Sequence, residues 1–164
     1  MAIKETMRLT DSLQRCKEYL RRHIDKGVKC PCCNQTVKLN RVVLNRRMVF
    51  ALNEIHKATL TETWCHVPTQ LAHLQRLRVY PKLSYWGLIE SMVDVAGFKD
   101  KNKGYWRVTD KGYGFLLRGR RVPAYLKLYN RKIAGKSDDS VTCAQAYGDG
   151  YEGLVIPDFE DTNP

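Results

Sequence analysis

Two stretches decide the fold predicted for this chain: Gly87-Leu88-Ile89-Glu90 and, after a polar segment, Gly104-Tyr105-Trp106-Arg107-Val108-Thr109-Asp110-Lys111-Gly112. Each part begins with a glycine, which lets the chain turn, and continues into residues that favour a strand. Thr109 or Asp110 can cap a following helix, and Gly112 permits close packing at its start. The pattern predicts two strands joined by a polar loop over 93–103, then a helix over 111–117.

The residues upstream predict a strand and two helices. Residues 64–67 form a short candidate strand that ends at Pro68, and Thr69 can cap a helix over 70–78. Residues 80–86 predict a short helix, with Pro81 at its tolerated first turn. Strand, helix, short helix, strand, loop, strand and helix follow in this order over 64–119. The order resembles that of winged helix-turn-helix domains, where Gly-Leu-Ile and Arg-x-Thr-x-x-Gly occupy the same places.

This resemblance implies how the domain would contact DNA. In winged helices the second helix of the pair enters the major groove, and the loop between the last strands, the wing, touches the backbone or the minor groove. Phosphate contacts would come from Arg76, Arg78, Lys99, Lys101, Lys103 and Arg107. Base-edge contacts would come from Lys82, Ser84 and Tyr85. Because winged helices also serve as protein-interaction modules, binding to a protein is the alternative.

Further motifs resemble those of a known group of proteins. They are Cys-Pro-x-Cys at 30–33, Trp-x-His at 64–66, Lys-Leu-x-Tyr-Trp-Gly-Leu-Ile-Glu at 82–90 and Trp-Arg-Val-Thr at 106–109. Together they look like a family of small, uncharacterised proteins from tailed bacteriophages. The resemblance covers about residues 28–135. It implies a phage origin and a winged-helix fold. Because the first ten residues also lack the pattern of a signal peptide, we expect a location in the cytoplasm of an infected bacterium. It implies no particular reaction.

Charge is distributed unevenly along the chain. Residues 1–136 carry all 28 Lys and Arg and ten acidic residues, a net charge of +18. Residues 137–164 carry seven acidic residues and no Lys or Arg. A basic body with an acidic tail is typical of proteins that bind nucleic acid or another polyanion. Double-stranded DNA is therefore the expected partner, with the tail shielding the basic body. A host protein is the alternative, and the tail would then be a docking strand.

The cysteine cluster Cys30-Pro31-Cys32-Cys33 is the candidate metal site. Its C-x2-C spacing is that of a zinc knuckle, and Pro31 stiffens the turn. The sequence holds no second C-x2-C and no H-x3-H, so two further ligands must come from elsewhere. The preferred ligand set is Cys30, Cys33, Cys65 and His66, with Cys16 and His23 as second choices and Cys32 as a substitute for Cys33. A closed site of this kind would hold a structural zinc ion. Buried reduced thiols, an incomplete knuckle or a redox pair are the alternatives.

The rest of the chain predicts an α+β protein with four segments. A helix is expected over 10–26, capped by Thr10, and another over 41–57, capped by Asn40 and long enough to form a homodimer contact. Asn130-Arg131 is a candidate hairpin turn within 124–134. The expected segments are N-terminal helices and knuckle at 1–60, the winged helix at 61–120, a β-hairpin at 121–136 and an irregular acidic tail at 137–164.

Several classes of protein are not indicated. No run reaches the ~18 apolar residues of a membrane span, and the first residues lack the pattern of a signal peptide. Residues 130–137 only approximate a phosphate-binding loop, and the acidic Asp138 and Asp139 follow at once. G-x-S-x-G and H-E-x-x-H motifs are absent from the sequence. We therefore expect no enzyme. The predicted function is that of a phage-encoded regulator or accessory protein that acts by occupying DNA. The alternative is a phage effector that binds and inhibits a host protein, such as a defence nuclease or a transcription component.

Overall fold

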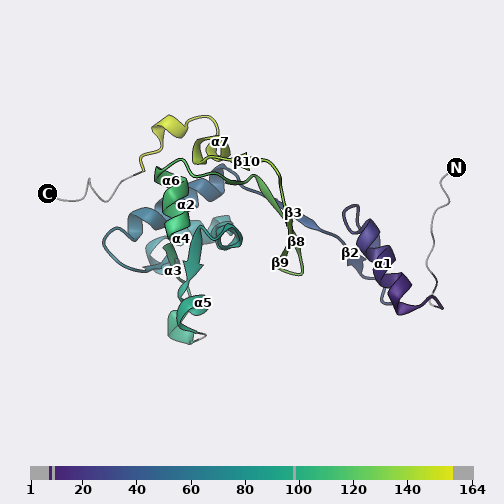
Figure 1. Ribbon diagram of the computed structural model, residues 1–164. Coiled ribbons are helices and arrows are strands. Elements are labelled where there is room, and N and C mark those ends of the chain that lie inside the picture. The colour runs from purple at the N-terminus through teal and green to yellow at the C-terminus, as the bar shows by residue number, and fades with distance from the viewer. Residues whose placement is uncertain (1–7, 9, 98, 157–164) are drawn as a thin grey trace. The chain divides into compact units, whose positions relative to one another are not determined.

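A computed structural model describes residues 8, 10–97 and 99–156, which form two compact units (Figure 1). Of the described residues, those up to Val42 and Lys127–Gly135 make up the first unit. Val43–Leu126 and the residues from Lys136 onward make up the second. Helices alternate with small antiparallel sheets, so the α+β class is confirmed. Among these residues, no helix is both long and apolar enough to cross a membrane.

The first unit begins with helix α1 (Leu13–His23) and a two-stranded hairpin, β1 (Val28–Lys29) and β2 (Thr36–Val37). α1 is shorter than the predicted helix because its N-cap is Ser12, whose side chain accepts a hydrogen bond from the backbone of Arg15, and not Thr10. The cysteine cluster lies in the turn between β1 and β2.

A second hairpin joins β8 (Tyr125–Tyr129) to β9 (Lys132–Lys136), and β3 (Asn40–Val43) pairs with β8 on its other side. Asn130 and Arg131 have φ angles of 48° and 61°. Two successive left-handed residues form the tight turn that matches the twist of a hairpin, so the predicted turn is confirmed.

The predicted helix over 41–57 is wrong at its start. Residues 40–43 are strand β3, in which β-branched Val42 and Val43 favour extended backbone. Helix α2 (Arg46–Ala58) begins after Asn45, whose side chain accepts a hydrogen bond from the backbone of Met48. A true N-cap five residues later along the chain therefore replaces the predicted one.

The core of the second unit is built around α2. Val49, Leu52 and Ile55 are fully buried there, at helical spacing. The elements that follow α2 are β4 (Cys65–His66), α3 (Val67–Gln70), α4 (Ala72–Leu77), the 3-10 helix η1 (Tyr80–Trp86), β5 (Ile89–Ser91), α5 (Met92–Ala96), the 3-10 helix η2 (Asp100–Asn102), β6 (Tyr105–Val108) and α6 (Asp110–Leu117). The predicted start of the helix over 70–78 is wrong, because α3 already begins at Val67 and Thr69 lies within it instead of capping it. Leu71, with φ −130°, then separates α3 from α4. The predicted polar loop over 93–103 contains α5 and η2.

Strands β4, β6 and β5 form one antiparallel sheet in that order. Cys65 pairs with Trp106, and Ile89 pairs with Val108. Residues opposite one another share a face, so these four side chains lie on the face toward the core. The other face carries His66, Tyr105, Glu90 and Arg107.

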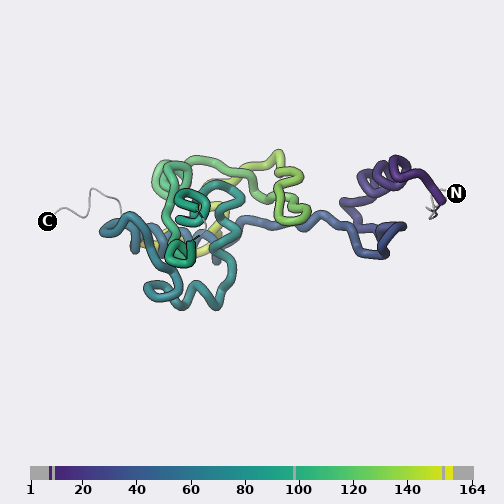
Figure 2. The backbone as a smooth tube through the Cα atoms, turned by 90° about the horizontal axis from the view of Figure 1, so that it is seen from below, coloured from purple at the N-terminus to yellow at the C-terminus, as the bar shows by residue number. Residues whose placement is uncertain are grey.

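The predicted irregular tail is wrong for residues 137–156. They contain β10 (Ser140–Val141), paired with β7 (Val122–Pro123), then helix α7 (Cys143–Tyr147) and the 3-10 helix η3 (Tyr151–Gly153). Thr142 and Gln145 form a capping box at the start of α7. α7 packs against α2, and the Arg46 guanidinium lies 4.7 Å from the centre of the Tyr147 ring. Figure 2 shows this yellow segment against the rest of the second unit.

Candidate nucleic-acid interface

Helix η1 is anchored to the second unit by one face. Tyr80, Leu83 and Trp86 are buried, and the Trp86 indole donates a hydrogen bond of 2.7 Å to the carbonyl of Pro123. The Tyr80 ring meets the Trp106 ring edge-on at 5.7 Å. Trp86 is therefore a core residue, Trp106 is half-buried against Tyr80, and only the opposite face of η1 is available to a partner.

The predicted base-contacting residues differ in how far they reach the surface. Lys82 is exposed, whereas Ser84 and Tyr85 are half-buried. The Ser84 hydroxyl donates 2.7 Å to the carbonyl of Pro81, so its hydrogen atom is already used within η1. Lys82 is the residue that this helix presents most fully.

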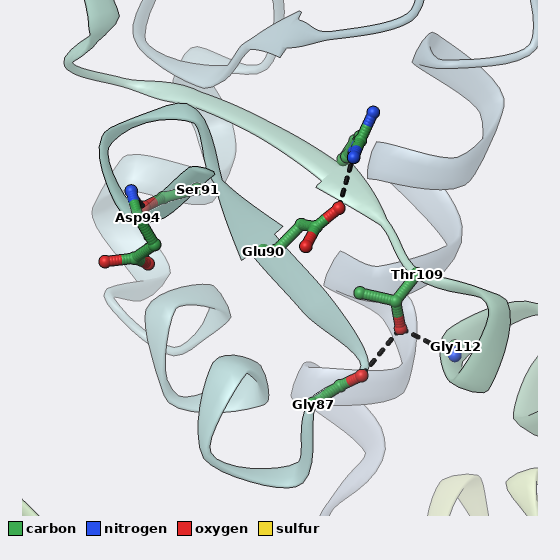
Figure 3. Close-up of polar contacts among 7 residues, drawn as sticks. Gly87, Glu90, Ser91, Asp94, Thr109 and Gly112 are labelled. Carbon is green, nitrogen blue, oxygen red and sulfur yellow. Dashed lines mark hydrogen bonds and ion pairs between the residues drawn. The ribbon is translucent and has the colours of Figure 1, made fainter. Parts of the chain in front are cut away.

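The end of η1 is held by Thr109 (Figure 3). The Thr109 hydroxyl donates 2.6 Å to the carbonyl of Gly87 and accepts a hydrogen bond of 3.1 Å from the backbone N–H of Gly112. Gly87 has φ +67° and reverses the chain between η1 and β5. One side chain therefore caps α6 and fixes the exit of η1 at the same time.

Arg107 is engaged within the sheet. Its Nε atom lies 2.6 Å from Oε1 of Glu90, and its guanidinium lies 4.4 Å from the centre of the Trp64 ring. Figure 3 shows Glu90 at the middle of β5 with this interaction dashed. A phosphate would compete with that carboxylate, so Arg107 is the weakest of the predicted phosphate contacts.

The connection between β5 and β6 is ordered by its own side chains. Ser91 caps α5 by accepting from the backbone of Asp94 and donates 2.6 Å to the Asp94 carboxylate. Buried Asn102 donates 2.8 Å to the carbonyl of Gly97. The exposed basic residues of this connection are Lys99, Lys101 and Lys103. Arg76 on α4 and Arg78, the residue that ends α4, are also exposed. Lys103 lies 2.6 Å from Asp100.

A hollow of about 560 Å³ lies in the second unit beside the Glu90–Arg107 pair. Thr63, Thr109, Asp110 and Lys111 contribute to its lining. Burial, followed by the charges of Arg120 and Lys136, lowers the pKa of Lys111. The lining carries both signs of charge, which does not favour an anion over a cation.

The predicted metal ligands divide between the units. Cys30 and Cys33 belong to the first unit, and Cys65 and His66 to the second. Cys65 faces the core, and burial raises its pKa to about 11. His66 lies on the opposite face, with Nδ1 2.8 Å from the Thr69 hydroxyl. Cys65 and His66 therefore do not point to one place.

The cysteine contacts in the first unit involve a residue that sequence reasoning ranked second. The Cys32 thiol lies near the thiols of Cys30 and of Cys16, which lies on α1. The helical spacing of Cys16 with Leu13 and Leu20 indicated only that it faces inward. Across the described residues, no three Cys, His, Asp or Glu side chains already surround one point as a metal site would require.

Comparison with known proteins adds no relative: no family model, curated protein or solved structure matches the chain.

Proposed function

We propose that this chain binds double-stranded DNA through its second unit, as a winged helix does, and acts by occupying its site. The observation that supports this most is the strand order β4–β6–β5. In a winged helix the first strand pairs with the third, and the third with the second. The helix before the second strand is then the one that enters the major groove.

Under this proposal η1 is the groove-reading helix and the β5–β6 connection is the wing. η1 leads through Gly87 directly into β5, which is the place that this role requires. Lys82 on η1 and Lys99 and Lys101 on the wing are exposed, and no ion-pair partner is found for them within the described ranges. These lysines can exchange their counterions for phosphates without breaking a contact.

The charge of the whole chain supports the same partner. A net +18 over residues 1–136 attracts any polyanion, and the ordered wing gives part of that charge a fixed place. The proposed phosphate contacts are Arg76, Arg78, Lys99, Lys101 and Lys103, with Arg107 as a minor one because of Glu90. Lys82, Ser84 and Tyr85 stay the proposed base contacts.

The proposal is tested by fluorescence anisotropy of the full chain with random duplex DNA at low and then physiological salt. We expect binding that weakens steeply with salt, because several phosphates release counterions. Lys101→Ala should reduce the slope of log K against log salt by about 1, whereas Lys82→Ala should in addition relax any sequence preference.

Lys57→Ala is the matched control, since it removes one positive charge from α2 of the same unit, where Lys57 pairs with Glu54 at 3.1 Å. It should leave the slope nearly unchanged. If the chain binds no DNA even at low salt, the DNA proposal fails and the alternative of a protein partner is favoured. If Lys57→Ala weakens binding as much as Lys101→Ala, the proposed orientation on DNA is wrong.

A further inference from the structure

The segment that contains α1 and the β1–β2 hairpin has almost no apolar core. Among the described residues up to Val42, Cys16 is the buried one, with 4% of its surface exposed, and Leu13 on the same helix is 66% exposed. Folded segments shorter than roughly 40 residues generally need a disulfide, a metal or a partner. The six cysteines are free, so no disulfide supplies this stability.

The tight turn between β1 and β2 carries three of the six cysteines, Cys30, Cys32 and Cys33. The backbone of Cys30 donates 2.8 Å to Gln35, and that of Asn34 donates 2.9 Å to Cys30, with Asn34 at φ +59°. The backbone N–H groups of Cys32 and Cys33 lie close to the Cys30 sulfur. The turn therefore folds Cys32 and Cys33 back toward Cys30, as the C-x2-C spacing of a zinc knuckle requires.

Three more thiols lie near the Cys30 sulfur, either directly or through another thiol. The Cys32 and Cys33 side chains lie close to that of Cys30, and Cys16 lies close to Cys32. The four thiols therefore form a continuous cluster that links α1 to the hairpin. They meet in pairs and do not yet surround one point. Cys32 and Cys33 are exposed, so their side chains have room to turn.

We propose that Cys16, Cys30, Cys32 and Cys33 bind one soft divalent cation, Zn²⁺ above all, and that this ion supplies the missing core of the segment that contains α1 and the β1–β2 hairpin. Structural Zn²⁺ ions in proteins are commonly bound by four ligands in tetrahedral geometry, and a set of four cysteine thiolates is one of the usual combinations. This assignment replaces Cys65 and His66 by Cys16 and Cys32. The reason is that Cys65 is buried in the second unit and faces away from His66.

The first test uses the unmodified full chain, purified under reducing conditions with zinc. Elemental analysis should find about one Zn²⁺ per chain. In alkylation followed by peptide mass spectrometry, the four thiols should be protected with zinc and should react after a chelator removes it. Cys65 and Cys143 should resist in both states, because both are buried and burial raises the pKa of each to about 11.

Two results of this test would overturn the proposal. One is a chain without metal whose four thiols react equally fast with and without zinc. The other is protection that comes with a loss of two hydrogens and no metal, which would show a disulfide in this cluster.

Substitutions then identify the ligands. Cys16→Ser and Cys30→Ser should each weaken Zn²⁺ binding at least about tenfold, since removing a ligand costs no less than removing its supporting contacts. Cys65→Ala and His66→Gln are the matched controls and should keep the metal. Trp64, Trp86 and Trp106 all lie in the second unit, so their fluorescence checks that this unit stays folded in every variant. Loss of zinc in the controls and its retention in Cys16→Ser would refute this ligand set.

Discussion

At the scale of single residues, Gly112 decides how closely α6 approaches Leu88, the residue directly before β5. A β-carbon placed on Gly112 would overlap the carbonyl oxygen of Leu88 and would lie 2.6 Å from Cγ1 of Val108. The first of these is backbone, which cannot move aside as the end of a long side chain can. The absence of a side chain at Gly112 therefore permits α6 to pack closely against the backbone before β5, where the Thr109 hydroxyl bonds both Gly87 and Gly112.

Gly112→Ala should destabilise the second unit by about 1–3 kcal/mol, because the added methyl group forces the α6 backbone away from β5. Gly114→Ala in the same helix is the control. The nearest atom to its added carbon is Cδ of the flexible Arg120 side chain, at 3.1 Å, and alanine favours the helix. Urea unfolding followed by tryptophan fluorescence measures both. Equal midpoints for the two variants would show that this close packing is unimportant.

At the scale of elements, the described part of the acidic C-terminal segment, residues 137–156, belongs to the folded second unit. Besides the contact of Arg46 with Tyr147, the Asn53 side chain donates 3.0 Å to the carbonyl of Val155. Truncation after Lys136 would remove β10 and α7 and expose α2. Such a truncation would therefore change stability and charge together, and it cannot isolate the effect of the charge.

The double variant Asp149→Asn and Glu152→Gln separates the two effects, because both side chains are exposed. If the acidic segment shields the basic body, this variant should bind random duplex DNA a few-fold more tightly at low salt. The gain should vanish when salt shortens the screening length to about 8 Å or less. Anisotropy measures the affinity, and thermal unfolding should be unchanged. An unchanged affinity at low salt would eliminate shielding as the role of this segment.

At the scale of the whole molecule, the two units differ in how much apolar surface they bury. α2 alone contributes Met48, Val49, Leu52 and Ile55 to a core at 0–2% exposure, whereas α1 contributes Cys16. Helices without such packing are marginal in water. The units should therefore open with different free energies.

Hydrogen exchange measured by mass spectrometry should reveal this difference. With a chelator present, α1 amides should exchange at least about tenfold faster than α2 amides, since local opening of α1 costs less free energy. Added Zn²⁺ should slow exchange in α1 and leave α2 unchanged. Equal protection of the two helices in the chelator would show that the first unit is stabilised by packing that the present contacts do not include.

Local signals account for what sequence reasoning predicted well. The Gly87 turn, the β5–β6 pair, the Asn130-Arg131 turn and the helix after Thr109 were all expected, because each depends on neighbouring residues. The errors arose where two local signals competed or where distant residues decide. Asn40 and Asn45 both suit a helix N-cap, and only the pairing of β3 with β8 selects Asn45. The composition of residues 137–156 suggested disorder, yet packing against α2 stabilises α7.

The sequence by itself determined the α+β fold class, the places of several turns and helix caps, the excess of positive charge over residues 1–136 and the C-x2-C turn. Only the tertiary structure decided the faces on which side chains lie. It placed Cys65 and His66 on opposite sides of β4, paired Arg107 with Glu90, and brought Cys16 to Cys32. The physical reason is that sequence spacing sets the period of an element, whereas strand register and helix packing set which residues meet across it.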